Sequence, residues 1–445
     1  MSRDWLKLSA GELGRRIGAG KINPVELTEA CLDATEAHPL QGRIYARITQ
    51  TRARTEAMAA AARARAGQRL GPLDGVPVSW KDLFDSAGVA TEAGSALLAG
   101  RVPVADAEVL RLATGAGLIC LGKTHMSELA FSGLGLNPVT ATPPCINDPD
   151  AVPGGSSSGA AASVAFGLAP AAIGSDTGGS VRIPAAWNDL VGLKTTSGRL
   201  SLQGVVPLVE SFDTVGPLCR TVEDAALLLA VLERGTAADL RGASLQGMRF
   251  LLLDTLALDD LRPEPAKGLE RALAALGKAG VRVEQGKQPL ASEALSLAAI
   301  LFNAEAYGTW RDVIEAAPEK MFPRILDRFR NGIGIEATDY VAALRRLREV
   351  RAGWMKAVAG YDAVILPTSP SLPPNAARLL SDPAYYVQEN LLALRNTKIG
   401  NMLGLCALTL PTGVPSAGIS LMAEPMAEER LLRIGAAAEA SLGLA

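Results

Sequence analysis

The segment Gly174 to Pro184, "GSDTGGSVRIP", gathers residue types that could do chemistry. Its glycines let the main chain approach a ligand closely and adopt positive φ angles. Successive backbone N–H groups in such a turn can surround a developing anion. Ser180 directly follows the pair Gly178 and Gly179, so its hydroxyl could attack a carbonyl carbon at this place. The segment therefore predicts a nucleophilic serine beside an anion-binding turn.

A nucleophilic serine needs a proton acceptor, and the chain contains only two histidines, His38 and His125. His38 precedes Pro39, which favours an exposed loop. His125 lies in "KTHMSE", which is typical of a turn at the end of a strand. We therefore interpret both histidines as structural and look for another base.

The sequence "GSSSG" at 155–159 matches the pattern G-x-S-x-G, which would make Ser157 the nucleophile of an α/β-hydrolase. That mechanism places its acid and its histidine after the nucleophile in the chain. Both histidines precede Ser157. We therefore interpret the match to this motif as a chance occurrence.

The sequence "GLICLGKT" at 117–124 matches the phosphate-loop pattern G-x-x-x-x-G-K-[ST]. A phosphate loop needs flexible residues that present backbone N–H groups between a strand and a helix. Here the four middle residues are Leu, Ile, Cys and Leu, which favour a buried strand that follows a helix. A nucleotide site is not predicted.

The base that remains is a neutral amine, because a buried lysine can lose its proton near working pH. Lys81 ends the apolar run "GVPVSWKD" at 75–82, so it should lie at the end of a buried strand. The alternative is that Lys81 is a structural lysine paired with Asp82 or another carboxylate, since buried lysines usually have partners.

The composition sets limits on the partners of this chain of 445 residues. Lys and Arg total 44 and Asp and Glu total 46, so the chain has no excess of positive charge that would attract nucleic acid or an anionic membrane. The five scattered cysteines and the absence of a His and Cys cluster argue against disulfides and a zinc site. We expect a cytoplasmic protein without cofactor or metal that acts on a small molecule.

The chain alternates short apolar runs with helix-forming stretches, which indicates α/β construction. Residues 1–66 are expected to be helical, 67–230 to form the catalytic core, 231–360 a variable and mainly helical region, and 361–445 to return to the sheet. Expected strands are 75–80, 117–122, 170–176, 249–254, 363–367, 407–411 and 418–422; expected helices include 106–114, 157–167, 263–279, 337–358 and a final helix.

The stretch Gly154 to Arg199 closely resembles the signature of the amidase signature family, and "GPLDGVPVSWKDLF" at 71–84 resembles its lysine segment. The match extends to 212–226 and, more weakly, to segments near the C-terminus, so the resemblance covers most of the chain outside 230–360. Thr195 departs from the family's usual proline. The resemblance implies one large domain over 1–445 with a central mixed twisted β-sheet covered by helices on both faces.

The resemblance also implies the roles of the site residues. Ser180 would be the nucleophile, Ser156 a bridging serine on a cis peptide, and Lys81 the base. The N–H groups of Thr177, Gly178, Gly179 and Ser180 would form the oxyanion hole, Ser157 would support the network, and Asp176 and Arg182 would hold the turn. The substrate would contact Phe131, Ser132, Gly133 and Leu134 in an apolar pocket.

The implied reaction is acyl transfer from an amide to Ser180 and then to water. We expect a stand-alone hydrolase of hydrophobic or aryl amides, anilides or carbamates, with some esterase activity, that is a monomer or homodimer. The glutamine-amidase subunit of a tRNA-dependent amidotransferase is an alternative. That subunit carries an acidic residue where this chain has Leu394, seven positions before Asn401. A catalytically inactive binding protein on the same fold is a further alternative.

Overall fold

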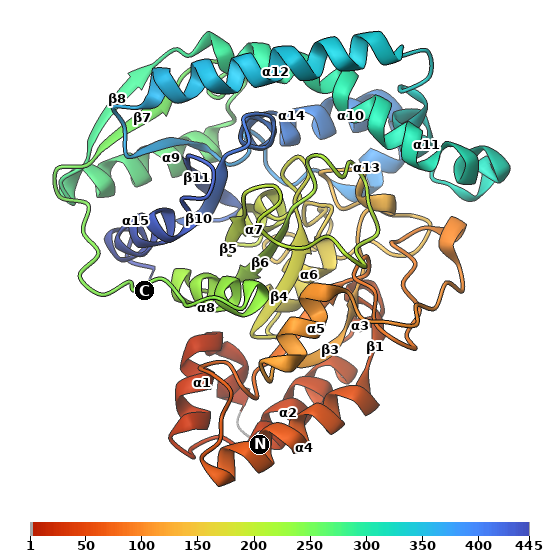
Figure 1. The fold of residues 1–445 in the computed structure, drawn as a ribbon, viewed down its shortest axis with the longest axis vertical. Helices are drawn as coiled ribbons and strands as arrows, with labels where there is room; N and C mark the ends of the chain where they lie inside the picture. The colour runs from red at the N-terminus through yellow and green to blue at the C-terminus, as the bar shows by residue number, and fades with distance from the viewer. Residues whose placement is uncertain (1–2, 445) are drawn as a thin grey trace.

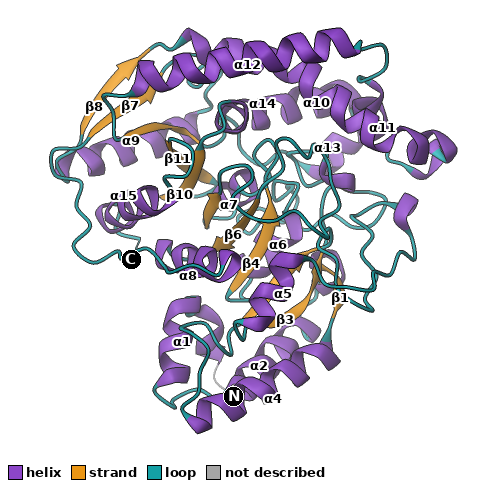
Figure 2. Ribbon diagram, viewed as in Figure 1, coloured by secondary structure: helices purple, strands orange, loops and turns teal. Residues whose placement is uncertain are grey.

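A computed structural model of the chain describes residues 3–444 and contains one sheet of 11 strands in the order β1-β3-β2-β4-β6-β5-β10-β11-β9-β7-β8. The strands are β1 Tyr45–Ile48, β2 Pro77–Lys81, β3 Ile119–Thr124, β4 Ala171–Ser175, β5 Val191–Lys194, β6 Val215–Cys219, β7 Arg249–Leu253, β8 Arg282–Gly286, β9 Ala363–Pro367, β10 Cys406–Val414 and β11 Ala417–Ala423. In Figure 2 this sheet crosses the centre of the molecule, with helices around it.

The sheet is mixed, as predicted from the resemblance. β2 pairs in parallel with β3 and β4, and β7 pairs in parallel with β8 and β9. The strands between these two groups pair antiparallel, including the long pair of β10 with β11. The parallel group at β2 and β4 places the carboxyl ends of both strands at one edge of the sheet.

Helices are distributed along the whole chain. They are α1 Ala10–Gly18, α2 Pro24–Glu36, α3 Gln41–Ile44, α4 Gln50–Ala66, α5 Glu108–Gly115, α6 Ser158–Ala165, α7 Arg182–Trp187, α8 Val222–Glu233, α9 Pro263–Lys278, α10 Pro289–Ala316, α11 Pro323–Arg330, α12 Ala337–Val358, α13 Ala376–Ser381, α14 Pro383–Met402 and α15 Glu428–Ser441. Short 3-10 helices cover Arg3–Lys7, Ala96–Leu98, Glu128–Ala130 and Pro318–Lys320.

Helices cover both faces of the sheet, as predicted. Thr409 of β10 pairs with Gly192 of β5, and a Cβ added to Gly192 would lie 2.7 Å from Ala185 of α7. The neighbouring strand residue, Leu408, instead packs against Gly435 of α15. Because successive strand residues point to opposite faces, α7 and α15 lie on opposite sides of the sheet.

The strands and helices expected from the sequence are present, with ends that differ by a few residues. Four strands, β1, β5, β6 and β8, were missed. β1 lies in the part expected to be helical, and β8 has the sequence "RVEQG", whose residues are exposed or half-buried at the edge of the sheet. An edge strand of this kind has no apolar run that would reveal it.

Long helices form a layer over one end of the sheet. Figure 1 shows α12 along the top of the molecule, with α10 and α14 below it and α11 at one end. α10 packs against α11, α12 and α14. The N-terminal helices α1, α2 and α4 lie at the opposite end (Figure 1). The region 231–360, expected to be mainly helical, therefore supplies both this layer and the strands β7 and β8.

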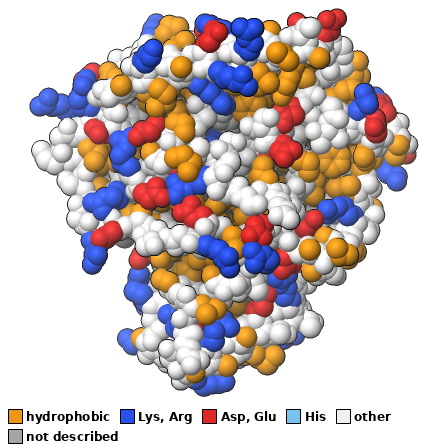
Figure 3. All heavy atoms as spheres, viewed as in Figure 1, with side chains coloured by type: hydrophobic (Ala, Val, Ile, Leu, Met, Phe, Trp, Pro, Cys, Tyr) orange, Lys and Arg blue, Asp and Glu red, His pale blue; other side chains and the backbone are white. Residues whose placement is uncertain are grey.

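The surface drawn in Figure 3 mixes positive and negative side chains, in line with the nearly balanced charge of the sequence. Within residues 3–444, no helix combines the length and the apolar character that a membrane span requires.

Candidate active site

Lys81 and Ser156 meet at the carboxyl end of β2. Lys81 is the last residue of that strand, and its Nζ lies 2.6 Å from the Oγ of Ser156. Both side chains are fully buried. The peptide bond between Gly155 and Ser156 is cis. A backbone hydrogen bond ties this loop to the predicted nucleophile, because the N–H of Ser157 donates to the carbonyl of Ser180 at 3.1 Å.

Lys81 has a second hydroxyl partner that the sequence analysis missed. Its Nζ also donates to the Oγ of Ser175 at 2.8 Å, and Ser175 is the last residue of β4. The parallel register of β2 and β4, with Trp80 opposite Ile173, brings these two strand ends together. No carboxylate of the described residues forms an ion pair with Lys81, so the expected alternative of a pair with Asp82 is not found. Asp82 pairs with Lys123 instead, at 3.1 Å.

The protonation of Lys81 follows from this setting. Burial lowers the pKa of Lys81 to about 7, although the negative charges of Asp213 and Asp176 act in the opposite direction. A neutral lysine is therefore present in quantity near pH 7 and can accept a proton through Ser156.

Asp176 organises the turn that precedes Ser180. Its carboxylate accepts hydrogen bonds from the N–H of Gly179 at 2.8 Å and from Nε and Nη2 of Arg182, both at 3.0 Å. Asn401 of α14 donates to the same carboxylate at 2.9 Å and accepts from Arg182 at 2.6 Å. Burial alone would raise the pKa of Asp176, but the adjacent Arg182 charge holds it below its usual range.

These contacts change the expected oxyanion hole. Gly179 has a φ of 136°, and a Cβ there would lie 2.1 Å from Thr397, so only glycine fits. Its N–H points to Asp176 and is not free to bind an oxyanion, which corrects the expectation for this residue. In the described part of the chain, the N–H groups of Thr177, Gly178 and Ser180 donate to no protein group.

Ser157 lies behind the turn. Its Oγ donates to the carbonyl of Ser175 at 3.2 Å and accepts from the N–H of the same residue at 3.3 Å. It is fully buried just before α6. Ser157 therefore joins the Ser156 loop to the end of β4, and it is not presented to solvent as a nucleophile elbow requires.

Ser180 opens into a small pocket of about 20 Å³ between the turn and the helices of the upper layer. Apart from Ser180, the lining residues come from six parts of the chain. They are Ala130, Phe131 and Ser132; Thr177 and Gly178; Leu208; Phe302 of α10; Arg328 of α11; and Leu394 and Lys398 of α14. Phe131 and Ser132 were expected here. The pocket therefore combines aromatic and aliphatic walls with two basic side chains.

Two expected substrate contacts do not line this pocket. Leu134 belongs to a separate buried cluster with Ile183 and Trp187. Gly133 lies behind the wall, because its N–H donates to Asn390 at 2.9 Å and a Cβ on it would meet Leu394 at 2.7 Å. The sequence could not show which residues of this loop face the pocket.

The two histidines lie elsewhere. His38 packs edge-on against Phe166 with ring centroids 5.3 Å apart. Burial lowers the pKa of His125 to about 4, and the N–H of its backbone donates to Ile44. Within residues 3–444, no group of His, Cys, Asp or Glu side chains has the arrangement of a metal site.

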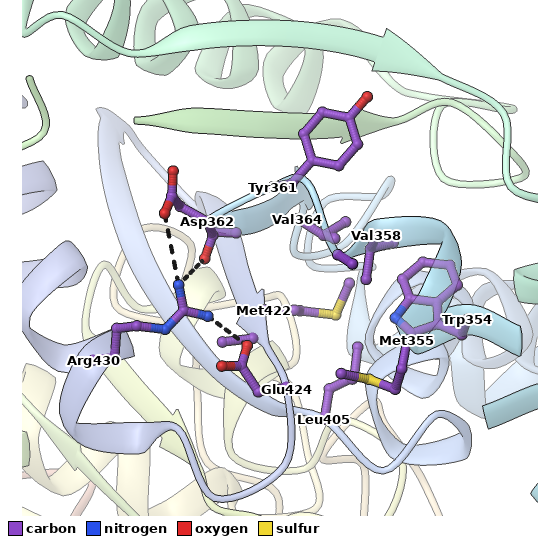
Figure 4. Close-up of a pocket in the computed structure, with 13 residues that line it drawn as sticks. Trp354, Met355, Val358, Tyr361, Asp362, Val364, Leu405, Met422, Glu424 and Arg430 are labelled. Atoms are coloured by element: carbon purple, nitrogen blue, oxygen red, sulfur yellow. Dashed lines mark hydrogen bonds and ion pairs between the residues drawn. The ribbon is translucent and has the colours of Figure 1, made fainter. Parts of the chain in front are cut away.

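A second cavity, of about 400 Å³, lies between α12, β9, β11 and α15 and shares no lining residue with the Ser180 pocket (Figure 4). Its one basic group, Arg430, already contacts Glu424 and Asp362. The other labelled side chains are mainly apolar, among them Trp354, Met355 and Met422 (Figure 4). Its lining contains no serine, cysteine, lysine or histidine, so it lacks the residue types of a nucleophile and its base.

Comparison with known families gives one family for most of the chain. The family model described as Amidase matches residues 26–432, a span that includes Lys81, Ser156 and Ser180. The chain belongs to the amidase family. It is accordingly an amidase-family hydrolase that acts on C–N bonds.

Two curated relatives illustrate the range of this amidase family. The chain is 36% identical to the 2-amino-5-chloromuconic acid deaminase of Comamonas testosteroni, over 98% of this chain and 96% of the relative. It is 35% identical to one subunit of the glutamyl-tRNA(Gln) amidotransferase of Moorella thermoacetica, over 98% of this chain and 96% of that subunit. The similarity therefore extends over nearly the full length of two relatives whose named activities differ.

Solved amidase structures share the fold. One crystal structure of an amidase has a TM-score of 0.87 at 30% identity and covers 97% of this chain and 99% of its own. The peptide amidase of Stenotrophomonas maltophilia has a TM-score of 0.81 at 27% identity. The match covers 98% of this chain and 97% of the peptide amidase.

Proposed function

We propose that the chain is a stand-alone serine hydrolase that cleaves a C–N bond through an acyl-enzyme on Ser180. The observation that carries the proposal is the 2.6 Å contact between Lys81 Nζ and Ser156 Oγ in a buried group beside the pocket that Ser180 lines. Neutral Lys81 takes a proton from the Ser156 hydroxyl, which in turn takes the proton of Ser180. The Ser180 oxygen then bonds to the amide carbon.

The relay returns its proton in the second half of the reaction. The tetrahedral intermediate collapses, the C–N bond breaks, and the departing nitrogen takes the proton from Lys81 through Ser156. Water then attacks the ester on Ser180, with Lys81 again the base, and releases the acid. The free N–H groups of Thr177, Gly178 and Ser180 are the proposed donors to the oxyanion, and each such donor typically contributes about 3 kcal/mol.

The amidotransferase alternative receives less support from the pocket. Glutamine carries an ammonium group that needs an acceptor, and the residues that line the pocket include no Asp or Glu. Leu394 stands where that alternative requires an acid, and it lines the wall. The apolar residues Phe131, Leu208 and Phe302 fit a small apolar or unsaturated acyl group better. A relative named for deamination of 2-amino-5-chloromuconic acid is compatible with a reaction that releases ammonia.

A fluorophosphonate probe tests the proposed nucleophile. We expect covalent labelling of the peptide that contains Ser180, and complete loss of labelling in Ser180→Ala. Ser201→Ala, a change at an exposed serine, is the matched control and should label normally. Mass spectrometry of the digested protein locates the label. Labelling of the folded protein at another serine, or none at all, would reject the acyl-enzyme proposal.

The pH dependence of kcat/KM tests Lys81 as the base. The active form is the neutral amine, which predominates above its pKa of about 7. Activity on an uncharged amide should therefore fall about tenfold per pH unit below pH 6 and reach a plateau above pH 8. The measurement is kcat/KM between pH 5 and 9, with circular dichroism to show that the protein stays folded. A flat profile would contradict a catalytic Lys81.

A further inference from the structure

Two basic side chains in the Ser180 pocket have no acidic partner. Arg328 and Lys398 both line it. Among residues 3–444, neither forms an ion pair with Asp or Glu, and neither makes a hydrogen bond to a protein group. Their contacts are with aromatic rings: the Arg328 guanidinium lies 4.5 Å from the centre of Phe131, and the Lys398 ammonium 5.5 Å from that of Phe302. Both residues are half-buried, and a charge that is partly removed from water without a counter-ion is unfavourable, so such a pair calls for an anion.

We propose, building on the function proposed above, that the substrate carries a carboxylate on its acyl portion and that Arg328 and Lys398 bind it. This refines the sequence-based expectation of a hydrophobic or aryl amide, anilide or carbamate. Aromatic contacts hold the two cations in place but do not neutralise them. A planar guanidinium and an ammonium that converge on one pocket match the oxygens of a carboxylate.

The two cations also perturb each other. Burial and the nearby Arg328 charge lower the pKa of Lys398 to about 8. Burial lowers the pKa of Arg328 as well, and the Nε of Arg328 is a buried donor without an acceptor. An anion between them would offset the repulsion between the two positive charges and accept a hydrogen bond from Arg328. The charges of the pocket are therefore balanced only when an anion is bound.

A carboxyl from the protein does not fill this role. Glu128, two residues before Ala130 of the pocket lining, accepts from the hydroxyl of Ser95 at 2.8 Å and from the N–H of Phe322 at 2.9 Å. Burial raises the pKa of Glu128 to about 7, so it is largely protonated in weak acid. Its oxygens are occupied by neutral donors, and it forms no ion pair with Arg328 or Lys398.

The position of Lys398 indicates a short acyl group. A Cβ added to Gly178, in the proposed oxyanion turn, would lie 3.6 Å from the Cε of Lys398. The carboxylate would therefore sit a few bonds from the carbon that Ser180 attacks. The pocket is also small, about 20 Å³, and the long side chains of Arg328 and Lys398 form part of its wall. Monoamides of short dicarboxylic acids have this shape and charge.

The test compares charged and neutral amides of matched length. Succinamate and glutaramate are compared with butyramide and valeramide, and ammonia release gives kcat/KM. We expect wild-type protein to prefer the carboxylates by at least about a hundredfold. Lys398→Met and Arg328→Met should each reduce that preference by at least about tenfold, because a charge-assisted contact is lost. Arg330→Met, on the same helix but paired with Glu315 at the surface, is the matched control and should keep the preference.

Binding is measured separately from turnover, so that the two proposals can fail independently. Calorimetric titration of the Ser180→Ala protein with glutarate should show binding that Lys398→Met and Arg328→Met weaken at least tenfold. Equal activity on charged and neutral amides, an unchanged preference in both variants, or no glutarate binding would each overturn the carboxylate proposal, even if Ser180 is labelled. Glutarate binding without labelling of Ser180 would instead overturn the acyl-enzyme and leave the anion site intact.

Discussion

Replacing Lys81 with methionine is expected to lower kcat/KM by about 10³-fold to 10⁴-fold while leaving the free energy of unfolding unchanged or slightly raised. The loss corresponds to removal of a positioned general base. Stability should persist because the close partners of Lys81 are two serine hydroxyls, at 2.6 and 2.8 Å, and no carboxylate of the described residues forms an ion pair with it. Methionine has nearly the same length and no charge to bury.

Lys123 provides the contrasting case. It is also fully buried, but its Nζ contacts Asp82 at 3.1 Å. Lys123→Met leaves that carboxylate buried, so we expect a loss of about 3 kcal/mol of stability, near the low end for a broken buried pair because Arg47 also contacts Asp82 at 3.4 Å. Urea unfolding and kcat/KM are measured on both variants. A large loss of stability in Lys81→Met would indicate a structural lysine and not a base.

The partners of Lys81 in the proposed relay should not act additively. Ser180→Ala alone is expected to reduce activity as much as Lys81→Met, and the double variant should be no worse than either single one, because each change disables the same step. Substantial activity in Ser180→Ala on a purified, correctly sequenced protein would contradict the assignment of the nucleophile.

The sequence analysis named Lys81 and Ser156, which the structure brings into contact, but it missed a contact that strand register decides. Lys81 was recognised because an apolar run leads directly to it. Ser175 lies in an equally clear strand, yet its role depends on the parallel alignment that puts Trp80 opposite Ile173. Lys81 and Ser175 are about ninety residues apart in the chain, and the alignment of their strands is set by the tertiary fold. The sequence around either residue does not indicate that alignment.

Lys398, on the far wall of the pocket, was beyond sequence reasoning for a similar reason. Leu394 and Lys398 lie four residues apart on α14, one helical turn, and so face the pocket together. The hydropathy of α14 has no clear periodic stripe, because its buried residues are both polar and apolar, for example Asn396, Ile399 and Asn401. A lysine in such a helix carries no local sign that it faces an active site.

Replacing Asp176 with alanine is expected to lower the free energy of unfolding by about 3 to 5 kcal/mol and to reduce activity strongly. Asp176 and Arg182 are both fully buried, and removal of one partner leaves an uncompensated charge. The change also removes the acceptor that fixes the N–H of Gly179 at 2.8 Å, so the turn before Ser180 loses its anchor. Urea unfolding and kcat/KM measure the two effects.

Two further variants separate charge from geometry in this prediction. Glu315→Ala removes a partner of Arg330 at the surface, where both side chains are more than a third exposed, and should cost no more than about 1 kcal/mol. The double variant Asp176→Ala, Arg182→Met should recover part of the lost stability, because the orphaned guanidinium is gone. Its activity should stay low, since the Gly179 N–H still lacks its acceptor and the neighbouring oxyanion donors are no longer held in place. Recovery of activity together with stability would show that Asp176 acts only as a counter-ion, and the N–H contacts within the turn would then have no part in positioning Ser180.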